Sequence, residues 1–134
     1  MPSESLAQAN RRYAYEQVQL WSNKPEAERQ KLQAAVKGLG VSLRMQGLAV
    51  TAGTLYRDSG TRPLADALAE WLLEKTPRRV LPEPQKVKGG WTRRLLAALA
   101  DADRASYQAA QSEALALAEL LKVYAQVWND AKEG

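Results

Sequence analysis

The sequence predicts an all-α fold, a single-domain bundle of about six helices in which a long C-terminal helix forms the spine. Ala and Leu dominate the composition, Phe is absent and β-branched residues are few, a mixture that favours helix over strand. Apolar residues recur at spacings of three and four in several segments, which is the period of a helix with one buried face. All six prolines lie at the apparent boundaries of these segments. A length of 134 residues suits one domain, residues 1–134.

The first helix is expected over residues 5–21, where Ser5 and Gln8 fit a capping box. Pro25 marks the start of a second helix shortly after the first one ends. We expect the second helix to end at the Gly-Leu-Gly of residues 38–40, with a kinked continuation as the alternative.

A third helix is predicted after this break, with five residues on one inward face: Val41, Met45, Leu48, Ala52 and Leu55. Gly47 then lies inside the helix, where a glycine costs about 1 kcal/mol relative to alanine. We interpret Gly47 as a point of close helix packing, with close approach of a nucleic-acid backbone as the alternative. Asp58-Ser59-Gly60 is expected to end this helix.

The fourth helix is expected to start at Thr61 and Pro63 and to end at Thr76-Pro77, because proline suits a first helical turn and cannot continue a helix. Its inward face is expected to consist of Leu64, Leu68, Trp71 and Leu72. Three carboxylates spaced by four residues are expected to form a solvated face: Asp66, Glu70 and Glu74.

The segment 77–90, PRRVLPEPQKVKGG, is expected to be a loop, because its three prolines and its terminal Gly-Gly are incompatible with a regular helix. It lies within the most basic part of the chain. Residues 75–94 contain seven basic side chains and one acidic one, a net charge of +6, whereas the rest of the chain carries −2 and the whole chain +4. All of the positive excess therefore lies in 20 residues, which suits an anionic partner.

A short fifth helix is expected from Thr92, and Asp101 or Asp103 is expected to cap the last helix, which runs to about Lys132. One stripe of the last helix consists of Tyr107, Ala110, Ala114, Leu117, Leu121, Tyr124 and Trp128. A second stripe beside it consists of Ala116, Leu120, Val123 and Val127. Two apolar stripes predict neighbours on both sides of this helix.

The chain contains no histidine and no cysteine. Disulfides, Ser-His-Asp and Cys-His catalysis are thereby excluded, and the usual zinc ligands are missing. No glycine precedes a Lys-Ser or Lys-Thr at the spacing of a phosphate-binding loop. We therefore expect a protein that binds rather than an enzyme, with no metal, no cofactor and no small-molecule substrate.

One alternative is a metal-dependent nuclease that uses Asp101, Asp103 and Glu113. We favour a helix-capping role for these aspartates, because two-metal sites normally gather more carboxylates. The longest apolar runs are far shorter than a membrane span, and the first residues lack the features of a signal peptide. We therefore expect a cytoplasmic protein without a membrane partner.

The basic stretch favours contacts with the phosphate backbone of a nucleic acid, which do not depend on base sequence. The candidate residues are Arg78, Arg79, Lys86, Lys88, Arg93 and Arg94, with Lys37, Arg44 and Arg57 as additions. The alternative is a solvated loop that keeps the protein soluble. Trp91 follows Gly89-Gly90 and precedes two arginines, so it is a candidate for stacking on a base, although packing in the core is favoured for the tryptophans in general.

Three segments carry a resemblance to a known family. They are Arg12-Tyr13-Ala14-Tyr15-Glu16-Gln17-Val18, Met45-Gln46-Gly47-Leu48 and Tyr107-Gln108-Ala109-Ala110-Gln111-Ser112-Glu113-Ala114-Leu115. Together they resemble the small all-helical subunit of the type III-B CRISPR effector, the RNA-guided Cmr complex, over nearly the whole chain. One departure is Leu120-Leu121-Lys122-Val123-Tyr124-Ala125, where the family often reads Trp-Leu-Lys-Arg-Phe-Ala.

The resemblance implies a non-catalytic subunit that stacks in copies along the complex and whose basic surface accommodates target RNA. Its partners are then other Cmr subunits, further copies of itself, and guide or target RNA. Two alternatives remain. One is a helical adapter that contacts only proteins, and the other is a stand-alone DNA-binding regulator, for which the sequence shows no helix-turn-helix spacing.

Overall fold

A computed structural model describes residues 5–82 and 89–133, with side chains described up to residue 128. These residues form six α-helices, and no strand is present in the described part. The helices are α1 (Leu6–Ser22), α2 (Glu26–Gln46), α3 (Leu48–Arg57), α4 (Arg62–Glu70), α5 (Trp91–Asp101) and α6 (Arg104–Glu133). The last turn of α4 continues as a π-helical turn, Trp71–Lys75. The all-α prediction is confirmed.

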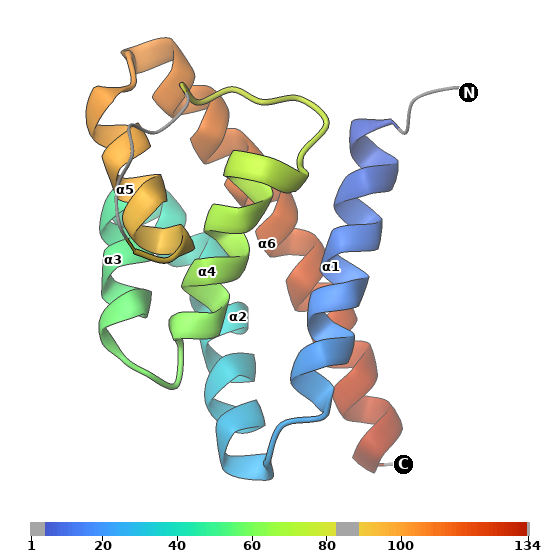
Figure 1. Ribbon diagram of the computed structural model, residues 1–134. Coiled ribbons are helices and arrows are strands. Elements are labelled where there is room, and N and C mark those ends of the chain that lie inside the picture. The colour runs from blue at the N-terminus through green and yellow to red at the C-terminus, as the bar shows by residue number, and fades with distance from the viewer. Residues whose placement is uncertain (1–4, 83–88, 134) are drawn as a thin grey trace.

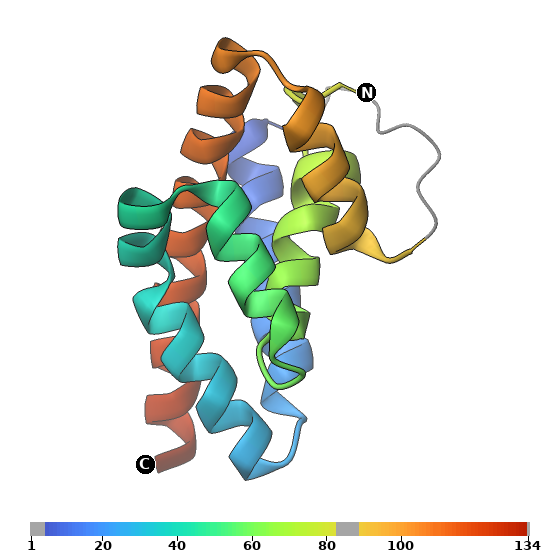
Figure 2. The same ribbon diagram turned by 90° about the vertical axis from the view of Figure 1, so that its left-hand side faces the viewer.

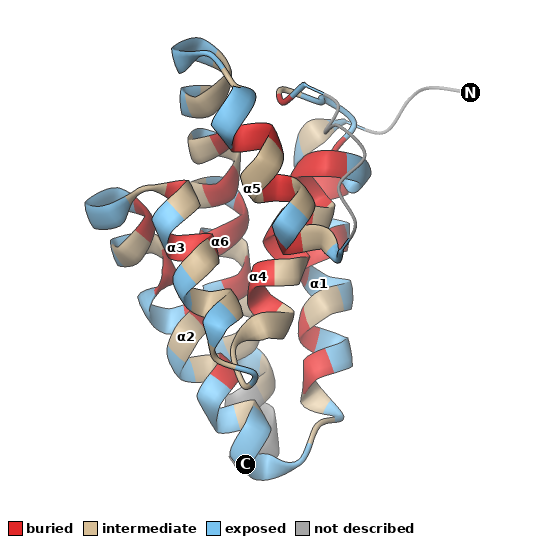
Figure 3. Cartoon of the chain, turned by 60° about the vertical axis from the view of Figure 1, so that its left-hand side comes forward, coloured by how far each residue is buried: buried red, intermediate tan, exposed pale blue. Residues whose placement is uncertain are grey.

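The 30-residue helix α6 is the spine of the bundle, as the sequence predicted. It runs the length of the molecule and packs mainly against α1 and α2, while α3 and α4 pack against each other and α5 covers them from outside (Figures 1 and 2). Its first predicted stripe is buried at Ala110, Ala114, Leu117 and Leu121. Figure 3 shows this buried layer running through the centre of the bundle, with the exposed residues on its outside.

The break between the second and third helices lies at Gly47 and not at residues 38–40, where we expected it. Helix α2 continues through Gly38 and Gly40 because its buried stripe packs against α6 along the whole length. That stripe consists of Leu32, Val36, Leu39 and Leu43. Gly47 has φ 85° and ψ 167°, a conformation that is essentially restricted to glycine. Gly47 therefore ends one helix and starts the next, and it does not lie within a helix.

This shift of the helix boundary changes which apolar residues are buried. Val41 and Met45, predicted to face inward, lie on the outer side of α2 and are 57% and 81% exposed. The predicted second stripe of α6 is also largely uncovered, with Val123 at 53% and Val127 at 62% exposure. The prediction that α6 has neighbours on both sides is confirmed by its packing against α1 and α2, but Val123 and Val127 of the second stripe are covered by neither helix. These side chains leave apolar surface on the outside of the bundle.

The end of α4 widens into a π-helical turn whose first three side chains lie in the core. Thr76 N–H donates to the carbonyl of Trp71 at 2.9 Å, the i to i+5 pairing of a π-turn. Trp71, Leu72 and Leu73 are all buried. The predicted inward face of the fourth helix is confirmed, since Leu64, Leu68, Trp71 and Leu72 are at most 1% exposed.

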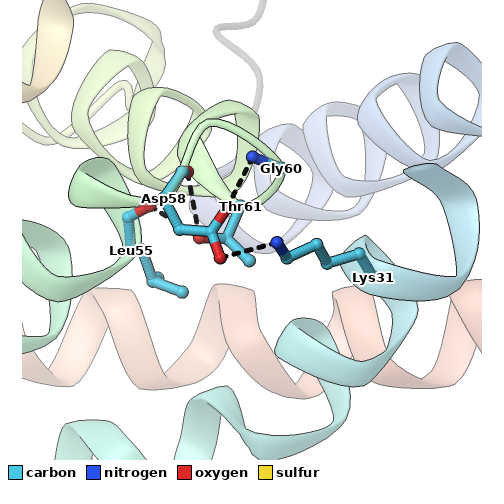
Figure 4. A network of polar contacts seen from close by, with 5 residues as sticks. All are labelled: Lys31, Leu55, Asp58, Gly60 and Thr61. Atoms are coloured by element: carbon cyan, nitrogen blue, oxygen red, sulfur yellow. Dashed lines mark hydrogen bonds and ion pairs between the residues drawn. The ribbon is translucent and has the colours of Figure 1, made fainter. Parts of the chain in front are cut away.

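The turn between α3 and α4 is held by a polar network that joins it to α2 (Figure 4). Asp58 accepts a hydrogen bond from the Gly60 N–H at 2.8 Å and pairs with Lys31 Nζ of α2 at 2.7 Å. Thr61 Oγ1 donates to the carbonyl of Leu55 at 2.6 Å. The predicted end of the third helix at residues 58–60 is confirmed. No helix in the described part of the chain is long and apolar enough to cross a membrane.

Candidate nucleic-acid interface

The basic part of the chain enters α5 through a turn built on glycine. Gly89 has φ 137°, in the region that favours glycine. A Cβ atom there would also lie 2.5 Å from Cδ of Arg93, so the arginine side chain packs across the glycine backbone. Gly90 is the residue before the first turn of α5, and it offers no side chain to cap the helix.

The cap is supplied instead by Asp66 on α4. Its Oδ1 accepts hydrogen bonds from Thr92 Oγ1 at 2.7 Å and from Thr92 N–H at 3.3 Å, which satisfies an otherwise unpaired donor of the helix start. Thr92 is completely buried. Asp66 and Glu70 were expected on a solvated face, and this is wrong, because both are half-buried and Glu70 accepts a hydrogen bond from Tyr13. No local sequence signal links Asp66 to a residue 26 positions later.

Two arginines are presented at this helix start. The guanidinium of Arg94 lies 4.6 Å from the ring centroid of Trp91, a cation–π contact. Arg93 is exposed and Arg94 is half-buried. Neither forms an ion pair among the described residues.

Trp91 is less available than its position beside the arginines suggested. The indole is half-buried and packs against the hydrophobic core, and Arg94 lies over its ring. A base that stacked on this ring would have to displace the guanidinium from that face. The geometry favours the structural interpretation of Trp91 over the base-stacking one.

The first part of the predicted loop is anchored to the bundle. Residues 77–82 and 89–90 lie outside the helices, as expected. Thr76 Oγ1 accepts a hydrogen bond from the Arg78 N–H at 3.2 Å, and Leu81 inserts into the core with 4% exposure. Burial raises the pKa of Glu113 on α6, while the nearby Arg78 charge and the Thr76 hydroxyl act in the opposite direction. The positive charge of Arg78 therefore interacts favourably with the Glu113 carboxylate.

The nine candidate residues do not form one surface. Arg93 and Arg94 lie on α5, whereas Lys37 and Arg44 lie on α2, and Figure 2 shows these helices at opposite sides of the molecule. Arg44 is paired with Glu119 at 3.6 Å, and Arg57 is the last residue of α3. Lys86 and Lys88 lie outside the described residues. The structure thus separates Arg93 and Arg94 on α5 from Lys37 and Arg44 on α2.

Two carboxylates of the alternative nuclease site, Asp101 and Asp103, lie at helix ends. Asp103 accepts the N–H of Ser106 at 2.7 Å at the start of α6, and this hydrogen bond lowers the pKa of Asp103. The predicted capping role is confirmed for Asp103. Asp101 ends α5. Within the residues that the structure describes, no group of three or more acidic side chains could hold a metal ion.

Comparison with known families agrees with this architecture. A model of the CRISPR-associated protein family Cas_Cmr5 matches residues 6–128. The chain belongs to the Cas_Cmr5 family. The family name places it among the subunits of the type III-B CRISPR system of antiviral defence, the Cmr complex, so the resemblance seen in the sequence is confirmed.

A solved structure shares the fold of this Cmr5 family member. The X-ray crystal structure of a CRISPR-associated Cmr5 family protein from Thermus thermophilus superposes with a TM-score of 0.74. The match covers 94% of this chain and 98% of that chain at 22% sequence identity. A comparison with curated proteins finds no match. At that identity the solved structure supports the fold, and the role of individual residues rests on the geometry described above.

Proposed function

We propose that this Cmr5 family protein is a non-catalytic subunit that contacts the RNA backbone in the Cmr complex through the start of α5. The observation that carries the proposal is the pair Arg93 and Arg94, held by a glycine turn and by Asp66 and left without an acidic partner among the described residues. A rigid support for two cations suits phosphate contacts, which position a nucleic acid without reading its bases.

The neighbouring basic residues extend this surface. Arg78 and Arg79 are exposed in the segment that leads away from α4, and we assign them a supporting role, because the Glu113 carboxylate partly offsets the Arg78 charge. Lys86 and Lys88 belong to the same stretch of sequence and are included in the proposal. The partners are other Cmr subunits, further copies of this chain, and guide or target RNA.

A different observation favours the alternative role, that of a helical adapter that contacts other proteins. Val123 and Val127 of α6 and Val41 and Met45 of α2 are more than half exposed. Apolar surface of this kind is typical of contacts with other proteins. An adapter role and RNA contact are compatible in one subunit, because the apolar residues and the α5 arginines lie on different helices.

The test measures target-RNA binding by the assembled complex. Replacing Arg93 and Arg94 with Glu should weaken binding, while the double variant Lys37→Glu and Arg57→Glu is the matched control with the same charge change on α2 and α3. Both variants should assemble, because none of the four substituted side chains belongs to the buried core. Unchanged RNA affinity in a fully assembled Arg93→Glu, Arg94→Glu complex would remove RNA contact from the proposal and leave the adapter role.

A further inference from the structure

A groove opens between α1 and α4, next to the start of α5, and neither Arg93 nor Arg94 lines it. It has a volume of about 410 Å³ and is lined in part by the indole of Trp91. Its main lining residues are Gln17, Leu20, Pro63, Asp66, Glu70 and Trp91. A second hollow adjoins it along α1 and is lined by Glu16, Gln19, Leu20 and Asn23. Leu20 and Asn23 line both hollows.

Part of the groove lining is apolar. Leu20 is 62% exposed, and it lies in the same groove as Pro63 and Trp91. An isolated exposed leucine needs no explanation. An exposed leucine set in a concave surface beside an indole and a proline ring offers a place for an apolar side chain from outside.

The walls of the groove carry fixed negative charge. Glu70 Oε1 accepts the Tyr13 hydroxyl at 2.9 Å, and Asp66 Oδ1 accepts the Thr92 hydroxyl at 2.7 Å. Each of these hydrogen bonds uses one oxygen of its carboxylate, and a carboxylate can accept at both oxygens. The two carboxylates are thus held in place while they keep the capacity to accept from a further donor.

A third carboxylate belongs to the same group. Glu16 lines the adjoining hollow. Burial raises the pKa of Tyr13, and the charges of Glu70, Glu16 and Asp66 raise it further. Among the described residues, Lys24 is the only cation that lines either hollow. The groove is therefore a negative region in a chain whose net charge is +4.

We propose that this groove binds a segment of a partner protein that presents a Lys or Arg side chain next to an apolar one. The cation would meet Glu16 and Glu70, and the apolar side chain would cover Leu20. The side-chain amides of Gln17 and Asn23 could pair with the peptide backbone of the segment. The negative charge disfavours nucleic acid here, and no three acidic groups of the described chain are placed to hold a metal ion.

The proposal does not rest on RNA contact, so it is tested on the full chain alone. The probe is a synthetic peptide of alternating Leu and Arg, compared with a peptide of alternating Leu and Gln, and binding is followed by the NMR shifts of backbone amides. We expect shifts confined to residues 16–24 and 63–70 and to Trp91, and tighter binding of the Leu-Arg peptide.

Variants separate the groove from general attraction between opposite charges. The double variant Glu16→Gln and Glu70→Gln should weaken binding about tenfold, and Glu70→Gln keeps an acceptor for Tyr13. Leu20→Ser should also weaken it, and the fold should tolerate this change because the leucine is exposed. The control variant is Glu28→Gln with Glu74→Gln, two exposed carboxylates outside the groove.

Three outcomes would overturn the proposal. The first is equal affinity for the Leu-Arg and Leu-Gln peptides, and the second is equal weakening by the groove and control variants. The third is binding of spermine at the same residues as tightly as the peptide, which would make the groove a site for small polycations. Loss of binding in the groove variants alone, with normal thermal unfolding, would support it.

Discussion

The hydroxyl of Thr92 donates a 2.7 Å hydrogen bond to the carboxylate of Asp66, 26 residues earlier in the chain. The backbone N–H of Thr92 donates to the same oxygen at 3.3 Å. Helix α5 is therefore capped by a side chain of α4 and not by its own preceding residue, Gly90. This bond fixes the position from which Arg93 and Arg94 project.

Removing this cap should destabilise the fold. We expect Asp66→Ala to lower the free energy of unfolding by about 1–2 kcal/mol, the usual cost of losing a helix cap, because the Thr92 hydroxyl is left buried without its acceptor. Denaturant unfolding followed by circular dichroism measures the change. Glu74→Ala, an exposed carboxylate in the following turn, should change the free energy by less than about 0.5 kcal/mol. Equal effects of the two variants would contradict the capping role.

Two glycines on either side of the end of α2 should respond to alanine in opposite directions. Gly47 has φ 85°, and a Cβ atom there would lie 3.2 Å from the Tyr107 hydroxyl, so Gly47→Ala should lower the free energy of unfolding by about 1–3 kcal/mol. Gly38 lies inside α2 with no atom within 4 Å of a new Cβ. Gly38→Ala should therefore raise the free energy of unfolding by about 0.5–1 kcal/mol. The same denaturant measurement compares both, and stabilisation by Gly47→Ala would refute the assigned helix break.

Tyr13 should make the fold sensitive to alkali. Burial, followed by the Glu70 charge, raises the pKa of the folded-state phenol, while the unfolded phenol titrates near pH ~10. Above that pH the unfolded state loses a proton that the folded state keeps, so the free energy of unfolding falls as pH rises. In Tyr13→Phe this part of the alkaline slope should disappear. The variant should also be less stable at neutral pH by about 1–3 kcal/mol, because Ala67 and Glu70 lose a donor. A slope identical to that of the parent chain would exclude Tyr13 as its cause.

Asp58 should contribute to sensitivity to acid. The hydrogen bond from Lys31, and then that from the Gly60 N–H, lower the pKa of this carboxyl in the folded state. Its stabilising contribution is therefore present above the unfolded pKa of about 3.9 and is lost as the pH falls through the lower folded pKa. Asp58→Asn should flatten the acid limb of stability against pH, and Glu28→Gln is the control on an exposed carboxylate. An unchanged acid limb in Asp58→Asn would show that the network in Figure 4 adds nothing measurable.

Salt should weaken RNA binding steeply if the arginines meet phosphates. Each neutralised phosphate releases counterion, so four to six contacts with a single strand give a log–log slope of about −3 to −4. Replacing Arg93 and Arg94 with Glu should make this slope shallower by about 1 to 2, with little dependence on base sequence. Filter binding by the assembled complex at several salt concentrations measures it. An unchanged salt slope in the assembled double variant would contradict the backbone proposal.

Most helices and the Asp103 cap could be predicted from the sequence, because their signals are local. The 3–4 spacing of α6 and the Ser5 cap of α1 depend only on residues within one or two turns, and Ser5 Oγ does accept the Gln8 N–H at 3.1 Å. The family resemblance also rests on short segments that can be read directly. The position of the break near Gly47 could not be read this way, since Gly38 and Gly40 carry the same local signal.

The sequence by itself determined the helical class, the absence of histidine and cysteine chemistry, and the concentration of positive charge in residues 75–94. Only the tertiary structure decided which glycine breaks a helix, because packing of the Leu32–Leu43 stripe against α6 outweighs the cost of glycine within α2. It also decided that Lys37 and Arg44 lie apart from Arg93 and Arg94. Charges distant in sequence form one surface only when the packing of their helices brings them to the same side, and here the buried faces of α2 and α5 direct them to different sides of the bundle (Figure 2).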